Sequence, residues 1–401
     1  MANTINTIKD GPGLFAKGVA QTLKDNLQLC KFVDKADESD FEGKNGFKAG
    51  DTIYTSIPDR PTVQEDNLDI TSLNSDLVEE KAALTLNKSA SVKKSFDSLE
   101  LATDIDVKNA LQRYGIPAAE SIAQQIESRC FGIAQNAIYN SAGTGAFTVA
   151  ETLAGRTKLN QSLAPVKDRM LFLNSTAGSA AVDVRKGLFQ SSDRIKEQYE
   201  EGYMGRSDGF DWVETELVKT HANGSDVTGI AVNDAAVAEG ASTLTIDGAS
   251  AAVTVGSVFT IAGVNKVHPI TKVDLGVLQQ FTVTSAGTTS IGITPSLYAA
   301  SGGLQNVTAL PADDAALVFV GAASTAITQN IAMHKSAFKM ATVPLYAPKG
   351  VDMVASETVD GITVNIVRDF DVNTRKVITR FDVLYAFDPV RPEWAVRYPG
   401  A

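Results

Sequence analysis

Residues 256–264 read Gly-Ser-Val-Phe-Thr-Ile-Ala-Gly-Val, an apolar run with a glycine near each end. Val, Phe, Thr and Ile favour extended backbone, and glycines that bound such a run indicate turns. Several short strands separated by turns are typical of a small antiparallel barrel or sandwich. Four similar runs surround the first one: Thr243–Ile246, Phe281–Thr284, Ile291–Thr294 and Ala316–Val320.

The charge density of this β-prone stretch differs from that of the remaining chain. Residues 221–330 contain 2 Lys, no Arg and 7 Asp plus Glu, so nine charges in 110 residues, whereas the other 291 residues carry 74. Sparse charge suits closely packed strands whose outer faces carry Ser and Thr. We therefore predict that residues 221–330 form a separate β-module.

The segments on both sides of the module predict one α+β body. Apolar residues at steps of four, four, three and four predict a long helix from Pro117 to about Tyr139; they are Ile122, Ile126, Cys130, Ile133 and Ala137. After the module, residues 361–367 and 377–387 alternate around a turn at 371–374, which predicts a hairpin. A chain that leaves one body and returns to it has an insertion, which requires an exposed loop whose ends lie close together.

Shorter elements are predicted between the long helix and the module. Met170–Leu173 is an apolar run of strand length, and the flanking patterns are helical. The predicted helices are 149–161, 177–188 and 192–201.

The N-terminal region predicts an amphipathic helix. Its apolar residues recur at helical spacing and form one stripe; they are Phe15, Val19, Leu23, Leu27 and Cys30. Gly11-Pro12-Gly13 ends any earlier helix. Periodicity leaves open whether the stripe packs on the protein's own body or on a neighbouring chain.

Residues 41–97 predict a long hairpin. Thr52–Ile57 alternates, with Ile53 sharing a face with Thr55 and Ile57, and extended runs follow at 83–86 and 91–96. The polar, acidic stretch between them has few apolar residues for a core of its own. We therefore expect it to project from the body.

Several classes of function are disfavoured. The net charge of −11 argues against a chain whose main task is to bind phosphate backbones. Cys30 and Cys130 show no metal or redox spacing, and the three histidines form no HxxxH pair. No phosphate-binding loop, dinucleotide fingerprint, nucleophile elbow or HExxH motif occurs. We expect no catalytic, cofactor-binding or metal-binding residues, and no enzyme.

No membrane or secretion segment is expected either. The first ten residues lack the apolar core of a secretory signal. The longest apolar stretch, Ala315–Ile327, is shorter than the ~20 residues that span a bilayer.

Short motifs in chain order carry a resemblance. Val390–Arg397 looks like an Arg-Pro-Glu-bearing terminal segment, and Arg169–Asn174 like a strand ending in Phe-Asn. Gly256–Val264, Phe281–Val283 and Ile291–Pro295 look like strands of an inserted domain. Together with the order of predicted elements, they resemble the major coat proteins of tailed bacteriophages, closest to the short-tailed Salmonella type.

The resemblance implies an α+β fold, the tailed-phage major capsid fold with an inserted antiparallel β-barrel domain. Its anatomy would divide the chain by region. The implied regions are an N-terminal arm (1–40), an extended loop hairpin (41–97), a peripheral domain with spine helix (98–144), an axial and peripheral body (145–220), the inserted β-barrel (221–330) and a return to the axial and peripheral domains (331–401).

The implied function is a major capsid protein that assembles into the icosahedral shell around the double-stranded DNA of a tailed phage. Implied partners are other copies in hexamers and pentamers, a scaffolding protein and a portal protein, with no sequence-specific nucleic acid and no membrane. The implied place is the virion, after assembly in the host cytoplasm. Candidate contacts between subunits are Phe15, Val19, Leu23, Leu27, Ile53, Tyr54, Asp234 and Glu239.

Two alternatives remain open at this level. A nanocompartment shell protein of related fold would share the body, although the inserted module argues against it. The Thr- and Ser-rich strands of 221–330 also suggest a β-rich adhesin or carbohydrate-binding protein.

Overall fold

A computed structural model describes residues 11–36, 52–58, 80–97, 114–143, 147–185, 205–300, 303–346 and 350–400. The chain divides into two compact units, each built from three separate segments. Unit 1 contains Met1–Thr55, Ala83–Cys130 and Lys339–Asp388, and unit 2 contains Ser56–Ala82, Phe131–Phe338 and Pro389–Ala401. Each unit therefore depends on pairing between distant parts of the sequence.

Unit 1 is organised around a six-stranded sheet in which β1, β16, β19, β18 and β17 follow one another and β4 also pairs with β19. The antiparallel β18–β19 hairpin that alternation predicted is confirmed, with Asp371 opposite Lys376 across its turn. Asp371 accepts hydrogen bonds there from Asn373 N and Thr374 Oγ1. The strands are β1 (Asp34–Lys35), β4 (Lys88–Asp97), β16 (Phe338–Val343), β17 (Met353–Val359), β18 (Ile362–Asp371) and β19 (Lys376–Pro389).

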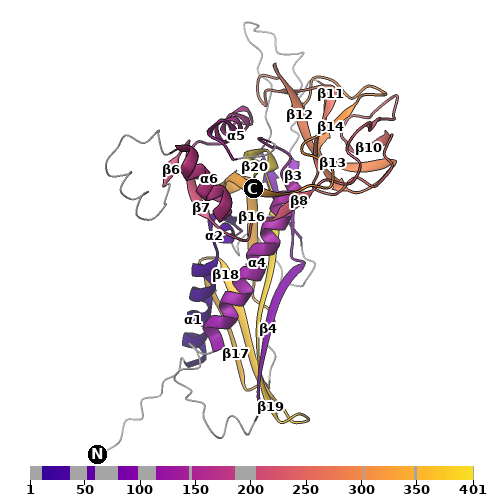
Figure 1. Cartoon of the computed structure of the whole chain (residues 1–401). Coiled ribbons are helices and arrows are strands. Elements are labelled where there is room, and N and C mark those ends of the chain that lie inside the picture. The colour runs from indigo at the N-terminus through magenta and orange to yellow at the C-terminus, as the bar shows by residue number, and fades with distance from the viewer. Residues whose placement is uncertain are drawn as a thin grey trace, which may run out of the picture. The chain divides into compact units, whose positions relative to one another are not determined.

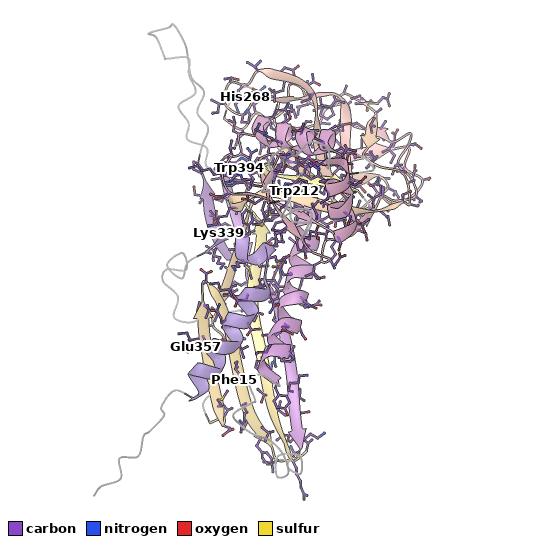
Figure 2. The ribbon with its side chains drawn as sticks, turned by 60° about the vertical axis from the view of Figure 1, so that its left-hand side comes forward. Phe15, Trp212, His268, Lys339, Glu357 and Trp394 are labelled. Carbon is purple, nitrogen blue, oxygen red and sulfur yellow. The ribbon has the colours of Figure 1, made fainter. Side chains whose placement is uncertain are left out.

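Helix α1 (Gly11–Asn26) packs on β17 and β18 of this sheet, as Figure 1 shows. The Phe15 ring lies 6.3 Å from the Phe381 ring, and Figure 2 labels Phe15 on the helix. The predicted helix is confirmed with two differences. It begins at Gly11 because Pro12 suits a first turn, and it ends before Cys30, which lies in the separate helix α2 (Leu29–Phe32).

The hairpin predicted for residues 41–97 is only partly as expected. β2 (Thr52–Ile57) and β3 (Glu80–Thr85) form a two-stranded sheet, but β4 pairs along its length with β19. Local alternation specifies a strand but not a partner nearly 300 residues away, so this pairing could not be foreseen. The intervening tip lies outside the described residues.

The long helix is confirmed as α4 (Ile116–Ala137), and the helix at Val149–Gln161 is confirmed as α5 with the same bounds. The helix predicted from 177 is α6 (Ser175–Arg185). The helix predicted at 192–201 lies outside the described residues.

The body of unit 2 has a sheet in the order β20-β15-β5-β7-β6, with β8 also paired to β15. Its apolar core lies between this sheet and helices α5 and α6, and includes Phe147, Leu171 and Tyr398. The strands are β5 (Arg169–Leu173), β6 (Arg206–Ser207), β7 (Phe210–Glu214), β8 (Thr220–Ala222), β15 (Ala326–His334) and β20 (Ala395–Pro399).

Residues 231–319 of unit 2 form a second six-stranded sheet, which we call the β9–β14 module. Its order is β14-β11-β12-β13-β10-β9. Val232 N donates to Ala315 O at 3.0 Å and Leu317 N donates to Ile230 O at 2.9 Å. Hydrogen bonds therefore also join the segments around β9 and β14, the two strands at the ends of this order. The strands are β9 (Ala231–Val232), β10 (Ala241–Asp247), β11 (Val258–Val267), β12 (Asp274–Ser285), β13 (Ser290–Leu297) and β14 (Leu317–Phe319).

The β9–β14 module has an apolar core of its own. Phe259 lies between Phe281 and Phe319, with ring centroids 5.8 and 5.3 Å away. The segments that enter and leave the module are adjacent, because β8 pairs antiparallel with the start of β15 and places Ala222 opposite Ala326. The chain therefore leaves the body sheet and re-enters it at the same place.

Candidate assembly and anchoring residues

The stripe of α1 is covered by the chain itself. Val19, Leu23 and Leu27 are 1%, 0% and 1% exposed, and Phe15 is half-buried. Of the two surfaces that periodicity left open, the structure places the protein's own body on this stripe. In this packing the three buried side chains offer no surface to a neighbouring subunit.

The two candidate contact residues on β2 lie on opposite faces of the strand. Ile53 is buried in an apolar cluster with Leu84 and Ala341, whereas Tyr54 on the opposite face is 66% exposed. Alternation along a strand produces this division. Tyr54 is therefore the candidate of this pair with a free surface.

The two acidic candidates lie in the β9–β14 module and already bind backbone groups. Glu239 accepts from Ala299 N at 3.0 Å and Ala300 N at 2.9 Å, and Asp234 accepts from Ala236 N at 3.0 Å. These bonds fix the turn between β9 and β10 and tie it to the end of β13. Glu239 remains exposed, so its charge is available to a partner.

A buried carboxylate that the sequence did not single out holds the start of α2. Glu127 on α4 is 1% exposed and accepts from the backbone N–H groups of Gln28, Leu29 and Cys30 at 2.7, 3.2 and 3.0 Å. Burial raises the pKa of Glu127 to about 7, although these three bonds act in the opposite direction. Its position next to Ile126 on the apolar side of the helix was the available signal.

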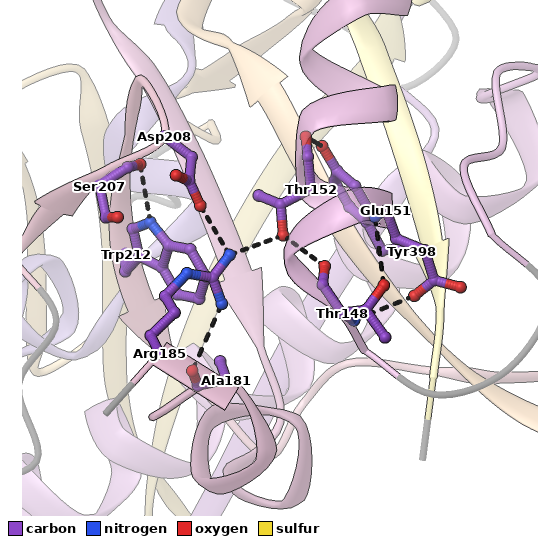
Figure 3. A network of polar contacts seen from close by, with 9 residues as sticks. All are labelled: Thr148, Glu151, Thr152, Ala181, Arg185, Ser207, Asp208, Trp212 and Tyr398. Carbon is purple, nitrogen blue, oxygen red and sulfur yellow. Dashed lines mark hydrogen bonds and ion pairs between the residues drawn. The ribbon is translucent and has the colours of Figure 1, made fainter. Parts of the chain in front are cut away.

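A buried arginine joins the helices of the body to β7 (Figure 3). The Arg185 guanidinium pairs with Asp208 at 2.6 Å, donates to Thr152 Oγ1 at 2.9 Å and lies 4.7 Å from the Trp212 ring centroid. Thr152 O in turn accepts from Tyr398 Oη at 3.2 Å. One charge thus connects α5, α6 and β7.

The start of α5 is fixed by a capping box, also drawn in Figure 3. Glu151 N donates to Thr148 Oγ1, and Thr148 N donates to Glu151 Oε2, both at 3.2 Å. This reciprocal pair satisfies two N–H groups that a helix start leaves free. It positions Thr152 one turn further on.

A second buried arginine connects the body to the β9–β14 module. Arg397 on β20 is 1% exposed and donates to Gly256 O at 2.7 Å and Thr282 Oγ1 at 3.2 Å. Burial lowers its pKa to about 9. A charged residue within the apolar run Ala395–Tyr398 was the signal for it.

A second polar contact lies beside Arg397. Gln280 accepts from Lys158 Nζ at 2.6 Å and from Ser141 N at 2.9 Å, and donates to Ser141 O at 3.2 Å. Burial lowers the pKa of Lys158 to about 8. We call the set Ser141, Lys158, Gly256, Gln280, Thr282 and Arg397 the β12–β20 interface.

The cysteines and histidines have local roles. Cys30 and Cys130 are free and fully buried. The ring nitrogen of His268 accepts from Thr271 N and that of His334 from Ser336 N, while His221 contacts Ser257 Oγ at 3.2 Å. Within the described ranges, no three His, Cys, Asp or Glu side chains are placed to hold a metal ion.

Among the helices that the structure describes, none combines the length and the apolar composition that crossing a membrane requires.

Comparisons with solved structures return phage capsids. The chain is similar to a structure from Mycobacterium phage Che8, with 10% identity, a TM-score of 0.49 and coverage of 93% of this chain and 90% of the other. The chain is also similar to the bacteriophage PhiM1 mature capsid, with 10% identity, a TM-score of 0.43 and coverage of 92% of this chain and 91% of the other. The CUS-3 coat protein I-domain is 30% identical over 24% of this chain and 97% of its own, with a TM-score of 0.20.

Sequence comparison gives the family. No curated protein matches the chain, but the family model described as P22 coat protein, gene protein 5, matches residues 10–400. Because that match covers nearly the whole sequence, the chain belongs to the P22 coat protein family and is a major capsid protein, a subunit of the shell of a virion.

Proposed function

We propose that this protein assembles through hexamers and pentamers into an icosahedral shell that encloses the double-stranded DNA of a tailed phage. The family match over residues 10–400 carries the proposal. Assembly would take place in the host cytoplasm with a scaffolding protein, and a portal protein would occupy one vertex. The net charge of −11 suits a wall that surrounds DNA without binding it tightly.

The regional anatomy belongs to the same proposal. Residues 221–330 would be the inserted β-barrel domain, which the separate apolar core and the adjacent entry and exit strands support. The other regions would be the arm (1–40), the extended loop (41–97), the peripheral domain with its spine helix (98–144), the axial and peripheral body (145–220) and the returning segment (331–401).

Contacts between subunits would use the exposed candidates, Tyr54 and Glu239. The buried members of the candidate set would support these contacts by holding the segments that carry them. Exposed tyrosines are well suited to interfaces, because a large rigid ring buries area at low entropic cost.

The direct test is negative-stain microscopy of the protein expressed with its phage's scaffolding protein. Closed particles of uniform diameter are expected. Persistent monomers, without particles or tubes of any kind, would exclude the proposed assembly.

The contact surface is tested with two exposed tyrosines. Tyr54→Ala should leave the monomer folded and reduce the yield of particles at least ~10-fold, since interface tyrosines contribute about 2 kcal/mol or more. Tyr346→Ala is the matched control, because Tyr346 is 80% exposed outside the candidate set. Normal particle yield from Tyr54→Ala would remove Tyr54 from the interface.

A further inference from the structure

The β9–β14 module and the body of unit 2 have separate apolar cores. The module's core cluster lies within residues 230–319, whereas the body's cluster draws on residues 142–212, 332 and 394–398, and they share no member. Two cores that share no side chain can each fold without fixing their mutual orientation. The orientation must therefore come from contacts outside the cores.

The β12–β20 interface supplies such contacts, and they are polar. Gln280 and Thr282 lie two residues apart on β12, so both point to the same face, while Phe281 between them enters the module's core. One strand thus presents apolar residues to its own core and polar residues to the body.

Arg397 is the most constrained member of the interface. Its backbone is held on both sides, since Arg397 N donates to Asn140 O at 2.9 Å and Arg397 O accepts from Ala142 N at 2.8 Å. Its guanidinium donates to two acceptors that both belong to the module region, Gly256 O and Thr282 Oγ1. A planar fork that serves two fixed acceptors tolerates little rotation.

The backbone at Gly256 comes unusually close to the body. Gly256 has a φ of +88°, and a Cβ atom there would lie 2.5 Å from Asn136 Oδ1. A side chain at this position would therefore displace the Asn136 amide and strain the backbone, because residues with a Cβ atom rarely adopt this φ.

The charge of Arg397 strengthens this dependence on orientation. Within the described part of the chain it pairs with no carboxylate, so its buried charge depends on two neutral oxygen atoms. A buried cation that loses its acceptors has a high free energy. A displaced module would leave Arg397 in that state.

We propose that Arg397 is the positioning residue that sets the orientation of the β9–β14 module on the body, and that Gln280 with Lys158 is its second contact. The inference rests on the proposed shell function, because a fixed orientation is what allows identical subunits to assemble with one curvature. It assigns a role in assembly to a side chain that is buried within its own subunit.

The test uses the full-length chain and hydrogen exchange. Arg397→Met retains an unbranched apolar side chain in place of the aliphatic part of the arginine and removes the guanidinium with its donors. The reporter is the Ser141 amide, which donates to Gln280 Oε1 across the interface. We expect exchange of this amide to rise at least ten-fold while the amides of β11–β13 keep their protection, and particles to lose their uniform diameter.

Two outcomes would overturn the proposal. Unchanged exchange at Ser141 would show that Arg397 does not hold the interface, and a parallel rise in β11–β13 would show a general loss of stability. Failure of the proposed function would look different, because the wild-type protein itself would form no particles whatever the exchange data show.

A milder variant keeps the proposal testable if Arg397→Met folds poorly. Thr282→Val preserves the shape of the side chain but removes the Oγ1 acceptor, whereas Thr282→Ser keeps it. Exchange at Ser141 should rise in the valine variant and stay within two-fold of wild type in the serine variant. Equal exchange in both variants would also overturn the proposal.

Discussion

Arg185 and Arg397, two buried arginines of unit 2, work in different settings. Arg185 and Arg397 each donate to a threonine hydroxyl and to a backbone carbonyl, but Arg185 also pairs with Asp208 and lies against Trp212. Arg185 joins elements that share one apolar core. Arg397 joins two separate cores and, among the residues that the structure describes, pairs with no carboxylate. The charge of Arg185 is thus compensated within one packed body, whereas the charge of Arg397 lies where two bodies meet and depends on neutral acceptors.

The largest expected effect comes from removing the compensation at Arg185. Asp208→Asn should lower the free energy of unfolding by about 3 kcal/mol, because it leaves a buried guanidinium without its carboxylate. The substitution should not strain the backbone, because Asp208 has a φ of 54°, a conformation that Asn accepts readily. The expected loss of stability therefore comes from the lost ion pair. Urea unfolding of the full chain measures the change.

Asp211→Asn, on β7 and half-buried, is the matched control for this prediction. It should cost less than about 0.5 kcal/mol. If Asp208→Asn is equally mild, Arg185 is no more dependent on a carboxylate than Arg397, and the contrast between the two arginines fails.

Glu127 extends the comparison to a buried acid that accepts hydrogen bonds from three backbone N–H groups. Its folded pKa of about 7 lies above its ordinary value of 4.5. Its contribution to stability is therefore present below pH 4.5 and is lost as the pH rises through 7. That loss should amount to about 2–3 kcal/mol, measured by urea unfolding between pH 5 and 8.

Glu127→Gln should flatten this pH dependence, because the amide does not titrate. Glu120→Gln on the exposed side of the same helix is the control and should retain the wild-type slope. An unchanged slope in Glu127→Gln would assign the pH dependence to other groups.

The smallest expected effect concerns α5, which carries contacts to both arginine regions through Thr152 and Lys158. Thr148→Ala removes the capping box and should cost about 1 kcal/mol, whereas Thr148→Ser should be close to neutral. Thermal unfolding of the two variants decides this. Equal melting temperatures would mean that tertiary contacts alone fix the start of α5.

Local patterns were sufficient for much of the fold. The 3.6-residue periodicity gave α4, and alternation gave β2 and the β18–β19 hairpin, because these signals depend only on neighbouring residues. The pairing of β4 with β19 depends on two segments far apart in sequence, and neither segment carries a local signal that identifies its partner.

The functional residues likewise divide into those that local patterns identified and those that only the structure shows. Periodicity identified the stripe with Val19 and Leu23 but could not say which surface covers it. Arg185, Glu127 and Arg397 were missed because a single charged residue in an amphipathic pattern is usually solvated. Only the three-dimensional arrangement shows that each is buried.

The position of Arg397 in the chain also sets an order in time. The β9–β14 module is complete at Phe319, whereas Arg397 comes about 80 residues later. At roughly 5–20 residues per second, a ribosome adds that stretch in several seconds. During synthesis the module therefore has its whole core before the residue that orients it exists, so we expect it to fold first and dock afterwards.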